Sequence, residues 1–236
     1  MQKIMRSSSF LFLGLLLFGG PVLLLSQPKI GKRQDLGAIR YKALNEVSGI
    51  AASRQNPNII WTHNDSGDKN AIYALNNRGI HLGDYEIAGV ECRDWEDIAI
   101  GPGPIPNQHY IYVGEIGDND AEFDVKYIYR LFEPKVSVNQ PPRRIRLLGV
   151  ERISFIFPDG NRDAETLLVD PDTKDIYIVS KREKVVRVYV AKYPQPVNQI
   201  FTVERVGTLP FSWAVGGDIS PTGREILIKT YDAVYY

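Results

Sequence analysis

Cysteine, histidine and net charge are all scarce in this sequence. Its 236 residues include one cysteine, three histidines and equal numbers, 28 each, of basic and acidic residues. A single cysteine excludes an internal disulfide framework. Cys92 has no neighbouring histidine that could act as its base, so we interpret it as a small packing residue. Balanced charge, without a basic block that alternates with aromatic residues, excludes nucleic acid as an expected partner.

Helical patterning is also missing. No convincing amphipathic helix follows residue 40, and the sequence contains neither a coiled-coil repeat nor a low-complexity tract. Thirteen tyrosines and many valine and isoleucine residues suit pleated strands better than helices. With 44% hydrophobic residues, the chain can bury a substantial core. The sequence therefore predicts an all-β protein.

What is present is a motif that occurs four times. Each copy has an apolar strand that opens on an acidic or small residue, a turn, a second apolar strand and a strand that carries tyrosine. Repeats of about 40–50 residues, each a small antiparallel meander, are typical of a β-propeller. The expected strands are 46–53, 59–65 and 71–76; 94–101, 110–115 and 127–131; 163–170, 175–181 and 188–193; and 216–220, 225–230 and 233–236.

The number of copies predicts how much of a ring is present. We expect three and a half four-stranded antiparallel blades in residues 41–236, with fourth strands at 84–88 and 201–205. A propeller removes its sheet edges only when the ring closes. We therefore expect a fragment of a six-bladed ring; a small complete four-bladed ring is the alternative. Residues 133–146, with three prolines, are expected to form an insertion or a long loop.

The N-terminus has the pattern of a targeting segment. Lys3 and Arg6 precede an uncharged apolar stretch, residues 7–28, which predicts a signal peptide or a signal-anchor helix over residues 1–28. Residues 29–40 form a polar lead-in to the propeller. We expect an extracytoplasmic monomer that is periplasmic, secreted or anchored, and that contacts the membrane only through the N-terminal segment.

The strand order predicts which polar residues share one face of the propeller. Residues that open the first strands and residues that end the second strands meet at the same end of the central axis, whereas the other end receives only short turns. The first group is Glu46, Ser48, Asp94, Glu96, Asp97, Asp163, Glu165 and Asp218, and the second is His63, Asn64, Asp65, Glu115, Asp118, Asn119, Asp120, Ser180, Lys181, Arg182 and Tyr231.

Carboxylates that converge in this way favour a bound cation. Like charges raise one another's pKa or recruit a counter-ion, and oxygen ligands suit hard divalent ions, of which calcium is one candidate. The alternative is that acidic loops, such as residues 115–124, are solvated and that Asp and Asn serve turns. Among these residues we predict Asp97, Glu115, Asp118 and Glu165 as cation ligands.

Three residues are candidates for catalysis. Asp65 lies two residues after His63 and could orient its imidazole for proton transfer or metal ligation, although a structural histidine is the alternative. Glu96 lies in Asp94-Trp-Glu-Asp97, where carboxylates directly precede a buried strand. The alternative for this segment is that its acids bond backbone amides of the adjoining blade.

Basic and aromatic residues complete the same face. Lys181 and Arg182 end a second strand, and they could bind a phosphate or carboxylate or could pair with Glu165. Together with Tyr231 they are the predicted ligand-binding residues. The expected partner is therefore a small molecule or a ligand of the cell envelope.

Several motifs of the repeats occur in combination: Ser48-Gly-Ile-Ala-Ala-Ser53, His63-Asn-Asp-Ser-Gly67, Asp94-Trp-Glu-Asp-Ile-Ala99, Gly117-Asp-Asn119, Asp163-Ala-Glu165 and Lys181-Arg182. With them, residues 41–236 resemble a group of exported bacterial β-propeller proteins that are sometimes labelled phytase-like or esterase-like. The resemblance implies a six-bladed ring and an exported location. More distantly similar propellers, the calcium-dependent phytases and the gluconolactonase-like proteins, hold divalent ions at the top of the channel. That resemblance marks Glu46, Asn64, Asn119 and Asp218 as further metal ligands.

Three functions remain open at this point. The face could bind a small ligand or hydrolyse an ester or phosphoester, with a metal that polarises the substrate and activates water. It could instead bind an envelope partner without catalysis, because propeller folds occur both in enzymes and in binding modules. The third alternative is an inactive, incomplete ring.

Overall fold

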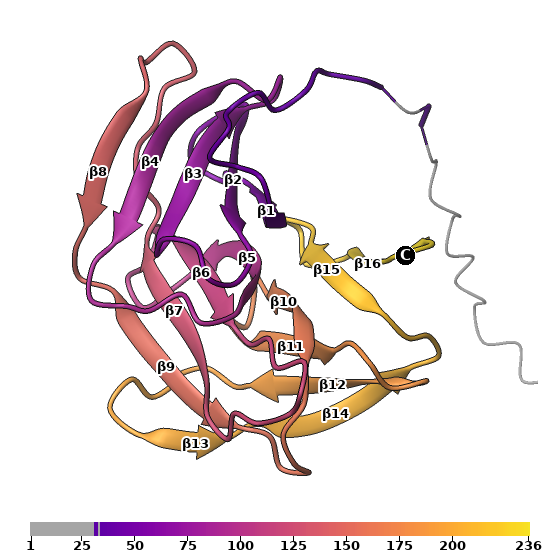
Figure 1. Ribbon diagram of the computed structural model, residues 1–236. Coiled ribbons are helices and arrows are strands. Elements are labelled where there is room, and N and C mark those ends of the chain that lie inside the picture. The colour runs from indigo at the N-terminus through magenta and orange to yellow at the C-terminus, as the bar shows by residue number, and fades with distance from the viewer. Residues whose placement is uncertain (1–30, 33) are drawn as a thin grey trace, which may run out of the picture. The chain divides into compact units, whose positions relative to one another are not determined.

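Seventeen β-strands and no helix make up the part of the chain that the computed structural model describes, residues 31–32 and 34–236 (Figure 1). The strands form four sheets that are arranged as the blades of a β-propeller, so the predicted fold class is confirmed. Nothing in these described ranges is a helix long and apolar enough to cross a membrane. The predicted signal or anchor segment lies outside them.

Each blade is an antiparallel meander whose first strand lies nearest the central axis. Blade 1 contains β1 (Val47–Ala52), β2 (Ile59–Asn64), β3 (Ala71–Asn76) and β4 (His81–Ile87). Blade 2 contains β5 (Trp95–Pro102), β6 (His109–Glu115), β7 (Lys126–Phe132) and β9 (Glu151–Ile156). Blade 3 contains β10 (Ala164–Val169), β11 (Ile176–Ser180), β12 (Val186–Ala191) and β14 (Glu204–Leu209). Blade 4 contains β15 (Ala214–Ile219), β16 (Ile226–Thr230) and β17 (Val234–Tyr235).

Two extra strands tie neighbouring blades together at their outer edges. β8 (Arg143–Leu147) pairs in parallel with β4 of blade 1, and β13 (Ile200–Thr202) pairs in parallel with β9 of blade 2. The expected insertion after β7 therefore ends in a strand. The fourth strand predicted at 201–205 is split, because its first part pairs with blade 2 and its second with blade 3. An apolar pattern predicts a strand but does not name its partner.

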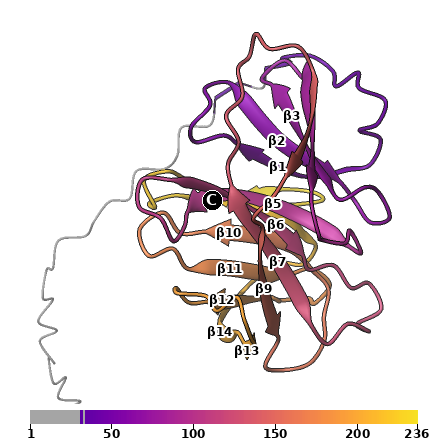
Figure 2. The same ribbon diagram turned by 90° about the vertical axis from the view of Figure 1, so that its left-hand side faces the viewer.

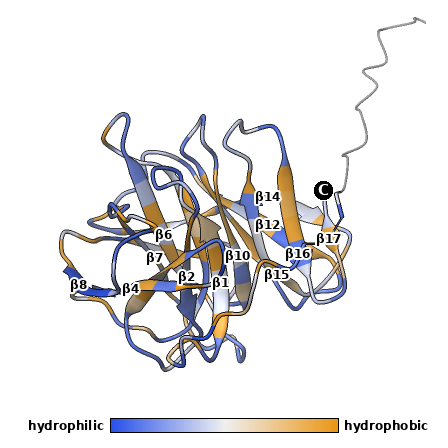
Figure 3. Ribbon diagram, turned by 90° about the horizontal axis from the view of Figure 1, so that it is seen from above, coloured by the Kyte–Doolittle hydropathy of each residue, from blue (hydrophilic) through white to orange (hydrophobic). Residues whose placement is uncertain are grey.

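Large side chains fill the space between adjacent blades. Trp61 and Trp95 are fully buried between blades 1 and 2, and Phe155 and Tyr189 are fully buried between blades 2 and 3. Hydrophobic residues gather in the strands, whereas many connecting loops are hydrophilic (Figure 3). Each large ring removed from water contributes about 2–3 kcal/mol. The blades are therefore held face to face mainly by apolar burial.

The inner strands carry β-bulges at the end where they begin. The register of β5 against β6 shifts at Glu96, and that of β10 against β11 shifts at Glu165. Comparable shifts occur in β1 and β15. A bulge bends its strand and re-aims a side chain. The repeated bulge is thus the device that determines where these two glutamates point.

Side chains of the inner strands also bond to the backbone of the next inner strand. Asp97 Oδ2 accepts a hydrogen bond from Leu167 N (2.9 Å), and Thr166 Oγ1, at the corresponding position of blade 3, accepts one from Gly216 N (3.0 Å). Buried backbone amides that lack a partner are costly, so these bonds fix the spacing of the blades. Figure 2 shows the inner strands of blades 1 to 3 stacked one beyond the other.

Blades 1 and 4 are in contact as well. The guanidinium group of Arg54, in the turn between β1 and β2, donates to Asp218 Oδ2 (2.9 Å) and to Ile219 O (3.1 Å) of β15. The four described blades are therefore linked in sequence around the axis. The expectation of a six-bladed ring stays a prediction.

Candidate functional site

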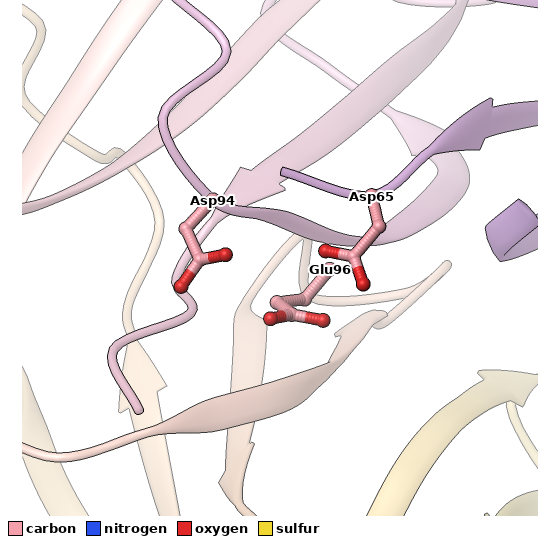
Figure 4. Close-up of side chains that lie close together, drawn as sticks. All are labelled: Asp65, Asp94 and Glu96. Atoms are coloured by element: carbon pink, nitrogen blue, oxygen red, sulfur yellow. The ribbon is translucent and has the colours of Figure 1, made fainter. Parts of the chain in front are cut away.

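Five carboxylates lie together at the end of the axis where the inner strands begin: Asp65, Asp94, Glu96, Asp163 and Glu165, here named the acidic cluster. One oxygen atom each of Asp65, Asp94 and Glu96 lies within 4.8 Å of the others, and the same holds for Glu96, Asp163 and Glu165. Figure 4 shows the first three carboxyl groups turned toward a common space. Glu96 belongs to both triads and is the centre of the cluster.

The framework of each blade places these acids. Asp94 and Asp163 stand directly before β5 and β10, and the two glutamates lie in the bulges of those strands. A residue just after each second strand hydrogen-bonds to the backbone of the aspartate that precedes the first strand. Gly117 N donates to Asp94 O (3.2 Å), and Lys181 N donates to Asp163 O (3.1 Å). Corresponding positions of blades 2 and 3 therefore meet at the axis.

Burial and mutual repulsion raise the pKa values of Glu96 and Asp94. Glu96 is 5% exposed, and its burial, with the negative charges of Asp65 and Asp94, raises its pKa to about 9. Burial, again with neighbouring carboxylates, raises the pKa of Asp94 to about 6. Within residues 34–236, no donor hydrogen-bonds to either carboxyl group. A cation among them would favour the charged forms and offset this cost.

A glycine keeps the space beside the cluster open. A Cβ atom at Gly117 would lie 2.4 Å from Asp94 Oδ2 and 2.4 Å from Glu96 Oε1. Any larger residue would push the two carboxylates aside, because real atoms do not approach so closely. The Gly117-Asp-Asn119 motif thus contributes a gap as well as polar side chains.

Two basic side chains lie at the edge of the cluster. Lys181 is paired with Glu165, and Arg182 Nε donates to Asp163 Oδ2 at 2.7 Å. A further bond from Arg182 reaches Asn119. The predicted pairing of Lys181 with Glu165 is therefore present, and Arg182 draws Asn119 to the same edge.

Three of the predicted cation ligands have their oxygen atoms engaged elsewhere. Both oxygens of Asp97 accept backbone hydrogen bonds, as described above for Oδ2 and from Ile98 N for Oδ1 (2.9 Å). Glu115 accepts from the backbone amides of Arg93 (3.1 Å) and Asp94 (2.6 Å). These two carboxylates therefore join backbone segments through hydrogen bonds.

Asp118 is the third of these residues. Its two oxygens accept from the backbone of Glu122 (2.7 Å) and Phe123 (3.0 Å), and Lys126 Nζ lies 2.8 Å away and is fully buried. Burial opposes its ionisation, but these donors prevail and hold the pKa of Asp118 below its usual value. It organises the loop that follows β6.

Glu46, Asn64 and Asp218 lie outside the cluster. The side chain of Glu46 is exposed, and its backbone N donates to Asn64 Oδ1 at 3.3 Å. Asn64 Nδ2 donates to Ala43 O (2.6 Å), so its amide braces the lead-in to β1. Asp218 pairs with Arg54 from the opposite end of the axis. None of the three is brought to the acidic cluster.

His63 is a buried residue between blades 1 and 2. Its Nδ1 lies 2.7 Å from Asn64 O, and its ring meets Trp95 edge-on with centroids 5.8 Å apart. Nδ1 therefore donates, and Nε2, which is buried, has no hydrogen-bond partner among the described residues. Burial lowers the pKa of His63 to about 4, so the ring is neutral at pH 7.

This histidine makes stability depend on pH. Its pKa is about 4 in the folded chain against 6.5 in a free side chain, so between these values only the unfolded chain binds the proton. Protonation of His63 in the unfolded chain has little effect above pH 6.5. Toward pH 4 it lowers the free energy of unfolding increasingly, by about 2 kcal/mol at about pH 5. We expect the free energy of unfolding in urea to fall by that much more in wild type than in His63→Gln between about pH 7.5 and about pH 5. Equal falls in the two proteins would contradict a buried, neutral His63.

The structure adds three residues to the sites predicted from sequence. Asp94 and Asp163 were placed on this face but not among its ligands, and both open the first strand of a copy. Trp213 stands at the same point before β15, and its side chain lies against Arg182. The signal that could have found all three is their common position in the repeat.

The comparisons with known proteins add little. No family model matches the sequence, and no curated protein matches it either. Among solved structures, one match is the hydrazine synthase of Kuenenia stuttgartiensis, with 11% sequence identity and a TM-score of 0.41, over 79% of this chain and 70% of that one. This likeness is too loose to support an argument.

Proposed function

We propose that the acidic cluster binds a divalent cation, with Glu96 as its central ligand and Asp65 and Asp94 beside it. The observation that supports this most directly is the side chain of Glu96: the residue is 5% exposed, its carboxyl group receives no hydrogen bond within residues 34–236, and it belongs to both triads. A carboxylate that is largely removed from water and lies beside other carboxylates favours a proton or a cation. Calcium suits a set of oxygen ligands with irregular spacing better than magnesium, which demands an octahedral shell.

The bound cation would hold an oxygen-rich small ligand at the end of the axis. As a Lewis acid it would polarise a carbonyl or phosphoryl oxygen, which is the chemistry that ester or phosphoester hydrolysis requires. Lys181 and Arg182 lie at the edge of the same cluster, paired with Glu165 and Asp163, where their N–H groups could donate hydrogen bonds to oxygen atoms of the ligand. The resemblance to exported phytase-like and esterase-like propellers supports the same class of ligand and an extracytoplasmic location.

Calorimetric titration of the chelator-treated protein with Ca²⁺, Mg²⁺ and Mn²⁺ tests the cation site. We expect Ca²⁺ to bind and to raise the thermal midpoint, because a ligand at 100 times its Kd stabilises by about 2.7 kcal/mol. Glu96→Gln should weaken binding at least tenfold, since it removes a charged ligand from both triads. Asp172→Asn, in an exposed turn at the opposite end, is the matched control and should bind as wild type does.

The result separates the remaining alternatives. Cation-dependent turnover of p-nitrophenyl acetate or p-nitrophenyl phosphate that is lost in Glu96→Gln would support a hydrolase. Cation binding without turnover would favour the envelope-binding propeller. No binding of any of the three ions by a folded protein would overturn the proposed cation site.

A further inference from the structure

Two exposed aromatic rings stand beside the acidic cluster. Trp213, which precedes β15, is 41% exposed, and Tyr231, which follows β16, is 62% exposed. Their ring centroids are 5.8 Å apart and their planes are inclined by 37°. The other two tryptophans of the chain, Trp61 and Trp95, are fully buried. We name Trp213 and Tyr231 the aromatic pair.

The backbone of Trp213 is held in an unfavourable conformation. Its φ is 59°, in the left-handed region that bulky residues avoid. Its N–H donates to Lys181 O at 2.7 Å, which ties the residue to the end of β11. Such conformations are costly and persist where surrounding contacts enforce them, often at ligand sites. The contact with Lys181 thus keeps the exposed indole ring at the edge of the cluster.

The aromatic pair and the acidic cluster form one continuous surface. Lys181 Nζ lies 5.7 Å from the centroid of the Tyr231 ring, and the guanidinium carbon of Arg182 lies 5.5 Å from that of Trp213. The same two cations pair with acids of the cluster. A ligand that covers the aromatic rings therefore lies next to the ion pairs at the edge of the cluster.

The charges of Lys181 and Arg182, between the aromatic pair and the acidic cluster, are already matched. Lys181 is neutralised by Glu165, and Arg182 by Asp163 with a further bond to Asn119. What the pairs still offer are hydrogen-bond donors and acceptors without net charge, which suit hydroxyl groups. The faces of aromatic rings carry partial negative charge and accept the partly positive C–H groups on one face of a saturated ring. A sugar ring combines both features.

We propose that the aromatic pair stacks against a neutral sugar ring whose hydroxyl groups reach the edge of the acidic cluster. The inference deepens the proposed function: it names a saccharide as the class of ligand, with the cation as a second contact. The pair itself needs no cation, so the two proposals can fail separately. A polyol hydroxyl is also a suitable neutral oxygen ligand for calcium, which joins the two parts of the site.

Tryptophan fluorescence offers a direct test, because Trp213 is the exposed tryptophan of the three in the chain. The probes are cellohexaose, maltohexaose and chitohexaose, each added to the whole protein in Ca²⁺ and again in EDTA. We expect at least one of them to give a saturable change in emission and to protect Trp213 from acrylamide. Glucose 6-phosphate and inorganic phosphate are the anionic comparisons.

Calorimetry of variants assigns the contact to the rings. Tyr231→Ala and Trp213→Ala should weaken binding of the active oligosaccharide by about tenfold or more, as removal of a central aromatic contact does. Tyr231→Phe retains the ring and should bind nearly as wild type does. Phe132→Ala, which removes a 48% exposed ring at the opposite end of blade 2, is the matched control and should leave binding unchanged.

The outcomes distinguish this inference from the proposed cation site. Binding in both Ca²⁺ and EDTA that depends on Tyr231 supports the saccharide surface even if no cation binds. Calcium binding with no response to any of the three oligosaccharides overturns the saccharide surface and leaves the cation site standing. Preferential binding of the phosphate probes, or saccharide binding that Tyr231→Ala does not weaken, overturns it as well.

Discussion

Replacing Asp97 by alanine is expected to destabilise the protein by about 3 kcal/mol or more. Asp97 is 2% exposed, and its carboxyl group accepts from Ile98 N and Leu167 N, each at 2.9 Å. The substitution would leave the buried amides of Ile98 and Leu167, in two inner strands, without this partner, and each such loss costs about 1–3 kcal/mol.

Urea unfolding at neutral pH measures this effect. Thr166→Val is the matched comparison, because Thr166 makes a single corresponding bond to Gly216 and its loss should cost only about 1 kcal/mol. The experiment also decides between two roles for Asp97. Unchanged stability together with weaker cation binding would contradict the structural role and would restore the cation ligand that the sequence predicts.

Gly49→Ala is expected to cost about 3 kcal/mol, at the upper end of what overpacking costs in a filled core. A Cβ atom at this position would lie 2.6 Å from His63 Nε2, 2.7 Å from Ile98 N and 2.9 Å from Asp97 Cα. Two of these atoms belong to the backbone of β5, which cannot yield unless blades 1 and 2 separate. Glycine is therefore required where the inner strands come closest.

Gly207→Ala is the control for this substitution. Gly207 lies in β14, where a Cβ atom would meet nothing within 4 Å, so the change should be neutral or slightly stabilising. Unfolding of the three proteins in urea, with circular dichroism as the signal, gives the difference. Equal stability of Gly49→Ala and wild type would show that blades 1 and 2 are not packed as closely as the structure has them.

One short segment of β5 contributes both to the fold and to the candidate site. Glu96 and Asp97 are adjacent in β5, yet the bulge directs the first toward the acidic cluster and the second toward the backbone of blade 3. A regular strand would also alternate its side chains, but it would hold them perpendicular to the sheet. The bulge is what lets a glutamate reach the axis while its neighbour joins two blades.

The repeat in the sequence was enough to predict the blades. The first strand of copy two was expected at 94–101 and is observed at Trp95–Pro102, and the other inner strands agree about as closely. Alternating apolar residues and turn chemistry are local properties, so they are visible without any tertiary information. The pairing of β8 and β13 with preceding blades was not predictable, because an edge strand's partner depends on where the chain lies in space.

The sequence by itself determined that this protein is a β-propeller and that acidic residues converge at one end of its axis. Only the tertiary structure decided which acids face a common space. Asp97 and Asp118 carry the same carboxyl group as Glu96, yet backbone amides and Lys126 occupy their oxygens, whereas the carboxyl group of Glu96 accepts no such bond within residues 34–236. The physical reason is that a carboxylate's availability depends on the donors around it, and those donors come from segments distant in sequence.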